Sequence, residues 1–228
     1  FIAAGCPFAT VTRYRCIHLQ EQFASLGIES VVQEWSEELP AGWLDEALSA
    51  DLIVLQRVPI NNSVRHLIAS ARQSGKQIAF DTDDLIFEPQ LTAWHRGVAN
   101  LSADEQVLYQ DGVQRYLATL EASDFVITAS PLLAELAQRR GKPAFVHRNA
   151  IGNEMQQLGE QLFAAREKRD SSQRVVIGYG SGTPTHDVDF EQAALALVDI
   201  MTRYSQVELW LAGPLQLPPM LDVFQKRI

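Results

Sequence analysis

Three aspartates end a short apolar run near the middle of the chain. The run covers residues 78–80 and stops at Asp81, Asp83 and Asp84. Such a run predicts a buried strand, and in open α/β sheets ligands bind outside the carboxyl ends of parallel strands. Carboxylates this close repel one another, which raises their proton affinity as acid–base chemistry requires. The acids therefore predict an active-site edge; the alternative is that they cap the turn or helix that follows.

Further polar residues follow the neighbouring predicted strands. They are Arg13 and Arg15 after the loop at residues 5–12, then Gln56 with Arg57, then Thr128 with Ser130. In a parallel sheet these strand ends converge on one edge. An arginine fork donates two hydrogen bonds at once to a phosphate, so the arginines predict an anion site beside a general base. A structural ion-pair network is the alternative, and the sequence leaves both open.

A glycine-rich stretch at residues 178–183 is the second candidate site. Its sequence, Gly-Tyr-Gly-Ser-Gly-Thr, lies between a predicted strand and a predicted helix. Backbone donors and the hydroxyl groups of Ser181 and Thr183 could hold a phosphate near the helix N-terminus. The stretch lacks the Gly-Lys-Ser/Thr ending of a P-loop. His186 follows it, and Asp187 or Asp189 could cap the helix. The other histidines are scattered without metal-ligand spacing, so no metal site is predicted.

Composition limits the class of protein. The 228 residues are 46% hydrophobic and 21% charged, as expected for a soluble globular protein. A net charge of −9 argues against nucleic acid as the main partner, because phosphate backbones need a basic face. Cys6 and Cys16 are expected to be reduced core residues. No apolar run reaches the ~20 residues of a membrane span, and no signal peptide is visible, so we expect a cytoplasmic protein.

The order of elements predicts the fold class. Strands are expected at residues 1–4, 31–35, 51–56, 77–81, 125–129 and 143–146, with helices between them. Strand and helix alternating at short spacing imply an α/β protein with a Rossmann-like doubly wound parallel sheet. Ser102 and Glu105 form a predicted capping box for a helix at residues 102–122. Ser130 is the predicted cap of a helix that has Pro131 at its first position.

A second, smaller unit is predicted after this sheet. We expect a first domain at residues 1–151, a linker helix at 152–173, and the beginning of a second Rossmann-like domain at 174–228. In that domain strands are expected at 174–179 and 207–212, a loop at 180–188, and a helix at 190–204. The chain opens at Phe1 without methionine and closes at Ile228 without a stop signal, which favours a fragment over a chain numbered after removal of a tag.

The run Ile78-Ala-Phe-Asp-Thr-Asp-Asp84 resembles the opening motif of haloacid-dehalogenase-type phosphatases, a strand that ends in Asp-x-Asp. The resemblance implies Asp81 as nucleophile, Asp83 as acid and magnesium as cofactor. Three predicted strands precede the motif here, Leu85 stands where a threonine is expected, and no later pair of aspartates completes a metal site.

A second resemblance covers almost the entire chain. It is to GT-B glycosyltransferases, specifically the retaining family-four type of bacterial surface-polysaccharide synthesis. The segments that carry it are Arg13-Tyr-Arg15, residues 51–57, 75–87 and 122–130, Leu133-Ala134, Val146-His-Arg-Asn-Ala-Ile151, residues 177–190, and Val207-Glu-Leu-Trp-Leu-Ala-Gly-Pro214.

This resemblance implies two Rossmann-like domains, with the acceptor on the first and a nucleotide-sugar on the second. The implied activity is hexosyl transfer from a nucleotide diphosphate sugar to a glycan or lipid-linked acceptor, without metal or cofactor, and peripheral membrane association is compatible with it. The family's pair of donor-binding glutamates, spaced eight apart, should lie well beyond Gly213, and this chain ends before that position, so we expect the fragment alone to be inactive.

The resemblance also suggests roles for individual residues. The expected catalytic residues are Asp83, Asp84 and Arg57. Substrate contacts are expected from Arg13, Tyr14, Arg15, Gln56, Asp81 and Ser130. Donor-phosphate contacts are expected from Gly180, Ser181, Gly182, Thr183 and His186. A non-catalytic sugar- or nucleotide-binding module of the same fold remains an alternative, as does a nucleotide-sugar epimerase, which acts on the donor alone.

Overall fold

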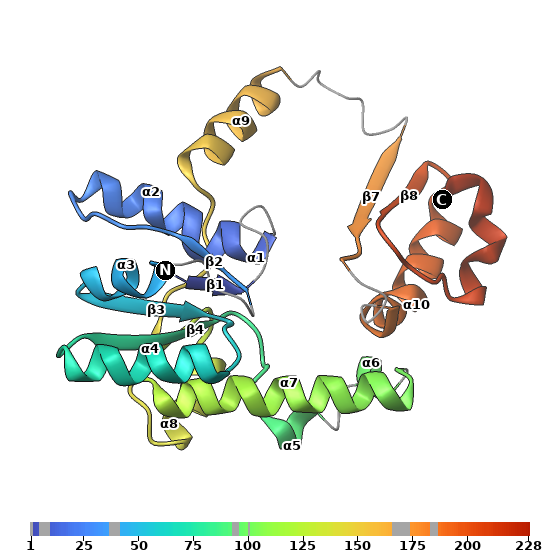
Figure 1. Cartoon of the computed structure of the whole chain (residues 1–228). Coiled ribbons are helices and arrows are strands. Elements are labelled where there is room, and N and C mark those ends of the chain that lie inside the picture. Colours follow the sequence, from blue (N-terminus) through green and yellow to red (C-terminus); the bar gives the residue numbers. More distant parts are fainter. Residues whose placement is uncertain are drawn as a thin grey trace. The chain divides into compact units, whose positions relative to one another are not determined.

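The chain divides into two units in the computed structural model shown in Figure 1. Unit 1 comprises Phe1–Gln90 and Leu108–Ala165, and unit 2 comprises Leu91–Val107 and Arg166–Ile228. The structure describes residues 2–4, 10–36, 42–92, 96–99, 101–165, 174–182 and 187–228. The domain boundaries expected from the sequence stay a prediction.

Unit 1 is built on a parallel sheet of six strands. In sequence order they are β1 (Ile2–Ala4), β2 (Gln33–Trp35), β3 (Leu52–Gln56), β4 (Gln77–Thr82), β5 (Phe125–Thr128) and β6 (Ala144–Val146). Their order in the sheet is β2-β1-β3-β4-β5-β6, and every pair is parallel. The predicted α/β class is therefore confirmed. The strand order reverses between β1 and β3, which is the switch point where such sheets bind ligands.

Helices of unit 1 lie on both faces of this sheet. A continuous helix runs from Thr10 to Ser25 through α1 (Thr10–Thr12), the π-helical turn η1 (Arg13–Ile17) and α2 (His18–Ser25). The others are α3 (Trp43–Ser49), α4 (Asn62–Gln73), α5 (Pro89–Thr92, whose last two residues belong to unit 2), α7 (Ala103–Ala122, whose first turns belong to unit 2), α8 (Pro131–Arg139) and α9 (Asn153–Ala164).

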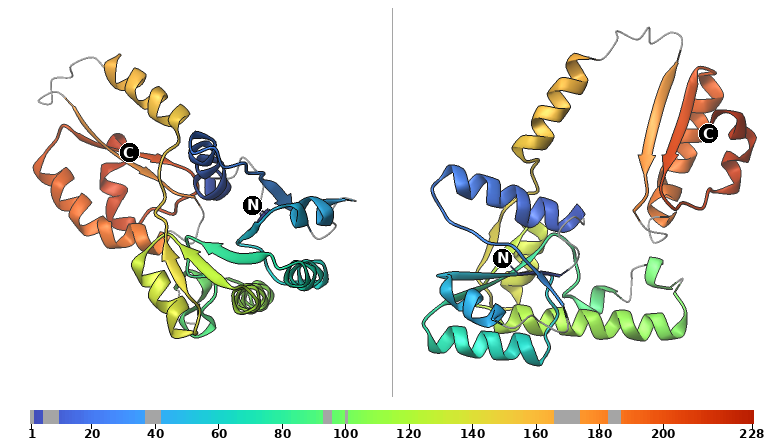
Figure 2. Two further views of the ribbon diagram at one scale, coloured as in Figure 1. Left: turned by 90° about the vertical axis from the view of Figure 1, so that its left-hand side faces the viewer. Right: turned by 45° about the horizontal axis from the view of Figure 1, so that its top comes forward.

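Alternation along the strands decides which face each side chain occupies. Leu55 and Phe80 are register partners, and both are buried among residues of α4, α7 and α8. Gln56 and Asp81, the next partners along β3 and β4, therefore point to the opposite face. The helix 10–25, blue in Figure 2, lies on that face. Polar side chains at the strand ends thus point towards this helix.

Helix caps follow local sequence signals. Ser102 and Glu105 form the predicted capping box, with Glu105 Oε2 accepting from the Ser102 backbone at 2.8 Å. Ser130 Oγ accepts from the backbone of Leu133, as predicted. The cap of α4 was missed: Asn61 Oδ1 accepts from the Val64 backbone at 2.8 Å, so α4 begins one residue before the expected Ser63.

Unit 2 contains a smaller parallel sheet. Strands β7 (Val175–Gly180) and β8 (Val207–Ala212) are joined by α10 (Asp187–Arg203) and followed by a 3₁₀ segment, η3 (Pro219–Arg227); α6 (Arg96–Ala99) also belongs to this unit. The helix begins at Asp187, earlier than the expected Phe190, and η3 was not predicted. No described helix is long and apolar enough to cross a membrane.

Removal of the α4 cap tests how much a local signal stabilises unit 1. Asn61→Ala leaves the Val64 N–H without its side-chain acceptor, so the free energy of unfolding should fall by about 1 kcal/mol. Asn61→Asp keeps an acceptor at the same place and should unfold at nearly the wild-type urea concentration. Equal midpoints for the wild type and Asn61→Ala would contradict this role.

Candidate functional site

A buried ion pair lies at the carboxyl end of β4. Arg15 donates from Nε to Asp81 Oδ1 at 2.9 Å and from Nη2 to Asp81 Oδ2 at 2.5 Å. Only 1% of Arg15 and 2% of Asp81 is exposed, so the pair is inaccessible to solvent. A guanidinium group and a carboxylate satisfy two donors and two acceptors at once in this arrangement. The sequence expectation that these strand ends converge is confirmed for these two residues.

Burial and the attraction between the two charges shift the pKa of each partner in opposite directions. Burial raises the pKa of Asp81, and the hydrogen bonds and charge of Arg15 oppose that rise. Burial works to lower the pKa of Arg15, but the hydrogen bond and charge of Asp81 raise it on balance. Loss of either partner would leave the other charge buried without compensation, which typically costs about 3–5 kcal/mol.

A second, more open ion pair joins Arg57 to the next two acids. Arg57 Nε lies 2.9 Å from Asp83 Oδ1 and Nη2 lies 2.7 Å from the same oxygen. Nη2 is also 3.5 Å from Asp84 Oδ2. Asp84 is largely exposed, and its Oδ1 accepts from the Leu85 backbone at 2.9 Å. Asp84 thus takes part in the turn, as the capping alternative proposed, and in the network as well.

Arg57 has an unusual backbone. It is the one non-glycine residue with positive φ among the described residues, at 48°. Side chains disfavour this conformation by roughly 1–2 kcal/mol. The Arg57 N–H donates to the Asp81 carbonyl at 2.9 Å, and α7 holds the next residues through Thr119 Oγ1, which donates to the Val58 carbonyl. Strain held in place by its surroundings is typical of functional sites.

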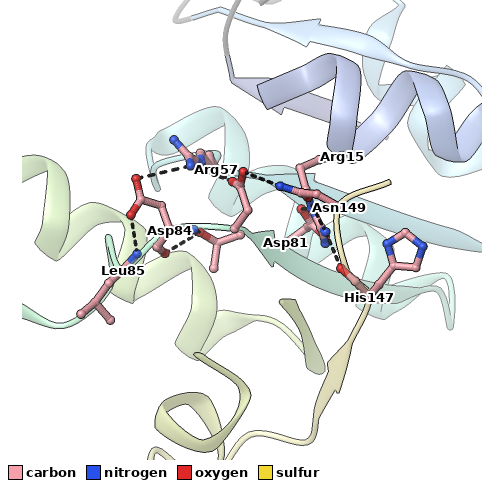
Figure 3. A network of polar contacts seen from close by, with 9 residues as sticks. Arg15, Arg57, Asp81, Asp84, Leu85, His147 and Asn149 are labelled. Carbon is pink, nitrogen blue, oxygen red and sulfur yellow. Dashed lines mark hydrogen bonds and ion pairs between the residues drawn. The ribbon is translucent and has the colours of Figure 1, made fainter. Parts of the chain in front are cut away.

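Asn149 connects the two ion pairs, as Figure 3 shows for Arg15, Asp81 and Asn149. Arg15 Nη1 donates to Asn149 Oδ1 at 3.1 Å, and Asn149 Nδ2 lies 3.4 Å from Asp83 Oδ2. Because a guanidinium group only donates, it fixes which end of the amide faces Asp83. Asp81, Arg15, Asn149 and Asp83 thus form one chain of contacts across three segments of unit 1.

Asn149 belongs to a strap, residues 147–153, that leaves β6 and leads into α9. Three residues of the helix 10–25 hold it. Arg15 Nη1 donates to the His147 carbonyl at 2.5 Å, His18 Nδ1 donates to the Ala150 carbonyl at 2.8 Å, and Glu21 Oε2 accepts from the Asn153 backbone at 2.7 Å. A Cβ atom on Gly152 would lie 2.6 Å from both His18 and Glu21 side-chain atoms, so a larger residue there would require these side chains to shift.

Gln56 is the least explained member of the site. It is 0% exposed, and neither its amide oxygen nor its amide nitrogen has a hydrogen-bond partner among the described residues. It pairs in register with Asp81 and with Ala3 of β1. An unsatisfied buried amide costs about 1–3 kcal/mol, so this residue is costly to the fold in its present surroundings.

Three further residues were expected to contact substrate, and the structure gives two of them, Tyr14 and Ser130, contacts within the protein. Tyr14 packs edge-on against His18 with ring centroids 5.2 Å apart. Ser130 caps α8, and its carbonyl accepts from Thr128 Oγ1. Arg13 lies half-buried on the π-helical turn. Substrate contact by these three residues stays a prediction.

Sequence reasoning missed residues that reach the site from distant segments. Asn149, Glu21 and the strap contact of His18 have no local signal, because their partners lie far along the chain. Tyr109 on α7 is another: burial and then the charge of Asp84 raise its pKa.

The glycine-rich stretch of unit 2 is described only in part. Thr183 and His186 lie outside the described residues. Gly180 ends β7, and Ser181 is 7% exposed, with its backbone N–H donating to the Ala212 carbonyl at 2.7 Å. Gly213, which the sequence analysis did not single out, has φ of +87°, and a Cβ atom there would lie 1.9 Å from the Ser181 carbonyl. Phosphate binding by Gly180, Ser181 and Gly182 stays a prediction.

The geometry disfavours the phosphatase alternative. A nucleophilic Asp81 would need an accessible oxygen, and both of its oxygens are buried against Arg15. Among the described residues, no group of three or more histidine, cysteine, aspartate or glutamate side chains could hold a metal ion.

Comparison with known proteins finds no matching family model and no matching curated protein. Solved structures with a distant likeness include UDP-GlcNAc 2-epimerases. That of Neisseria meningitidis, bound to UDP-GlcNAc, has 11% identity and a TM-score of 0.38, covering 94% of this chain and 60% of that one. That of Methanocaldococcus jannaschii has 12% identity and a TM-score of 0.40, covering 99% of this chain and 67% of that one. That of Rickettsia bellii has 14% identity and a TM-score of 0.32, covering 99% of this chain and 55% of that one. This chain thus spans between about half and two-thirds of the length of each of these proteins.

His147 should make the stability of unit 1 depend on pH. Burial, and then the charge of Arg15, lowers the pKa of His147 from its ordinary 6.5. A depressed histidine pKa contributes stability above pH 6.5 that is lost as the pH falls through the folded-state value. Urea unfolding at pH 7.5 and at pH 5 should therefore show a smaller loss for His147→Leu than for wild type. Identical losses would contradict the assignment.

Gly213→Ala should disturb the glycine-rich stretch. The added methyl group would collide with the Ser181 carbonyl, and the backbone at this position would hold alanine at an unfavourable positive φ. The free energy of unfolding of unit 2 should therefore fall by at least about 1 kcal/mol. Hydrogen exchange at the Ser181 amide should become faster. Gly178→Ala is the matched control, because its Cβ would meet nothing within 4 Å. Equal melting temperatures and exchange rates in the two variants would refute the close contact.

Proposed function

We propose that this chain contains the acceptor-binding domain and the beginning of the donor-binding domain of a glycosyltransferase. The reaction is transfer of a sugar from a nucleotide diphosphate sugar to a glycan or lipid-linked acceptor. The observation that carries the proposal is the polar network at the carboxyl edge of unit 1, which lies next to the switch point between β1 and β3. The sequence resemblance supplies the reaction class.

The two ion pairs of the network have different proposed roles. Arg15 uses four hydrogen bonds on Asp81, His147 and Asn149, so we assign it a positioning role in place of the direct substrate contact expected from the sequence. Arg57, Asp83 and Asp84 form the accessible half, with side-chain exposures of 22%, 13% and 63%.

The acids of the accessible half are better placed to accept a hydrogen bond from an acceptor hydroxyl group than to act as nucleophiles. Arg57 lies within ion-pair distance of both carboxylates. A charged carboxylate only accepts hydrogen bonds, so Asp83 or Asp84 can orient an acceptor hydroxyl and draw on its proton during transfer. Arg57 holds the two acids in place for that task, at the cost of its strained backbone.

Unit 2 is assigned the donor. Gly180 is the last residue of β7, and Ser181 and Gly182 follow it, at a position where backbone N–H groups bind phosphates in α/β folds. Because the Ser181 N–H already donates to the Ala212 carbonyl, the contact proposed for Ser181 is through its hydroxyl group. Thr183 and His186 complete the proposed donor contacts. Each role in unit 2 rests on position in the chain and on the sequence resemblance.

One observation favours a non-catalytic sugar- or nucleotide-binding module instead. Both acids of the accessible half already contact Arg57, so neither is held apart from a cation as a strong general base would be. Such a module would bind the same ligands without turnover.

Turnover measurements separate the two functions. Asp83→Asn and Arg57→Ala should each lower sugar transfer by roughly 10²–10⁴-fold in the longest natural form of the protein, because each removes a group that orients the acceptor. The assay follows nucleotide release from a panel of nucleotide sugars with and without acceptor. Asp45→Asn, an exposed aspartate on α3, is the matched control.

The outcomes discriminate the alternatives. Wild-type turnover in both variants would refute the catalytic assignment. Nucleotide-sugar binding without any turnover would support the binding module. Conversion of the donor in the absence of acceptor would support an epimerase.

A further inference from the structure

We propose that the carboxyl edge of unit 1 binds an uncharged, hydroxyl-bearing ligand such as a sugar ring through Gln56 and Asp83, and that it does not bind phosphate. The inference deepens the proposed function, on which it rests only for the identity of the ligand as the acceptor. The site itself is argued from the contacts of unit 1.

The charge of the network disfavours an anion. Asp81, Asp83 and Asp84 face the two guanidinium groups of Arg15 and Arg57, so the hydrogen-bonded network holds one more carboxylate than cation. Burial and then the charge of Arg15 lower the pKa of His147, which favours its neutral form over a further positive charge. A phosphate carries about −1.5 to −2 charges at pH 7, so it would be repelled here.

Most of the arginine donors in the network are already directed at protein atoms. Arg15 is buried and donates four hydrogen bonds to protein atoms. Arg57 directs Nε and Nη2 at Asp83 and Nη2 again at Asp84. A phosphate bound bidentately through Nε and Nη2 of Arg57 would have to displace Asp83 and Asp84, so Nη1 is the part of Arg57 that is not directed at these two acids.

The side-chain amide of Gln56 is available to form hydrogen bonds with a ligand. Its amide offers a donor and an acceptor, and neither has a partner among the described residues. It points to the same face as its register partner Asp81, the face on which Arg15, Asn149 and Asp83 meet. A neutral amide that both donates and accepts matches a hydroxyl group, which does the same.

Asp83 presents the complementary acceptor. Its Oδ1 receives both contacts from Arg57, whereas its Oδ2 has only the 3.4 Å contact from Asn149 among the described residues. That distance is longer than a normal N–H···O bond, so Oδ2 keeps capacity for a stronger donor. An O–H group can give a shorter, charge-assisted bond there.

The position of these groups fits a ligand site. Gln56 ends β3, and β3 lies beside β1 at the point where the strand order reverses. Ligands of open α/β sheets bind outside the strand ends at that point. The unpartnered amide, the half-used carboxylate and the switch point are three separate observations that indicate one site.

A binding experiment on the 228-residue chain tests the proposal. Methyl α-glucoside, methyl α-mannoside and myo-inositol serve as neutral probes, and inorganic phosphate and pyrophosphate serve as anionic probes, with saturation-transfer NMR as the readout. At least one neutral probe should bind, and Asp83→Asn and Gln56→Leu should each weaken that binding by about tenfold or more. Asp45→Asn should leave it unchanged.

The two variants should differ in their other properties. Asp83→Asn removes a negative charge, so any weak phosphate signal should increase while the glycoside signal falls. Gln56→Leu removes an unsatisfied buried amide, so its melting temperature should equal or exceed that of wild type. If Gln56→Leu does not fold, as judged by circular dichroism, Asp83→Asn still decides the question by its opposite effects on the two kinds of probe.

Three results would overturn the proposal. One is phosphate binding tighter than that of every neutral probe and lost in Arg57→Ala. Another is glycoside binding unchanged in Asp83→Asn. The last is a crystal structure of the glycoside-soaked chain in which only water contacts Gln56. Each of these leaves the turnover assay for sugar transfer unaffected, so failure of the hydroxyl site and failure of the transferase proposal are distinguishable.

Discussion

The buried contact between Arg15 and Asp81 is the interaction on which the site of unit 1 depends. Removing two charges from water is costly, and the low dielectric interior strengthens their attraction only when the geometry is good. Here the arginine satisfies both carboxylate oxygens and still has donors for the strap. The pair therefore joins three segments, β4, the helix 10–25 and residues 147–149, that are distant in sequence.

The remaining contacts are arranged around that pair. Asn149 is oriented by Arg15 and reaches Asp83, and His18 and Glu21 hold the rest of the strap along the same helix. The more open pair of Arg57 with Asp83 is fixed from the other face of the sheet, because α7 holds the residues that follow Arg57. The accessible carboxylates are thus held by contacts from both faces of one sheet.

This arrangement explains why an acidic, partly exposed group of residues is tolerated at the end of a buried strand. Each carboxylate has a cation or amide partner, and the excess negative charge is left at the accessible side, where water and ligands can reach it. Gln56 is the exception, since its amide is buried without a partner among the described residues. Polar groups left unsatisfied in an otherwise satisfied network often indicate function.

The sequence by itself determined the α/β class, the strand ends and several helix caps. Those features depend on local apolar runs and on side chains within three or four residues of the backbone they cap, as for Ser102 and Ser130. It also placed Asp81, Arg57 and Gln56 on one edge, because parallel strands end together. Which partner each charge takes could not be read from spacing. Arg15 and Asp81 are 66 residues apart, and Arg15 and Asn149 are 134 apart. Only the packing of the helix 10–25 and the strap on the sheet decided that Arg15 is buried while Arg57 and Asp83 remain accessible.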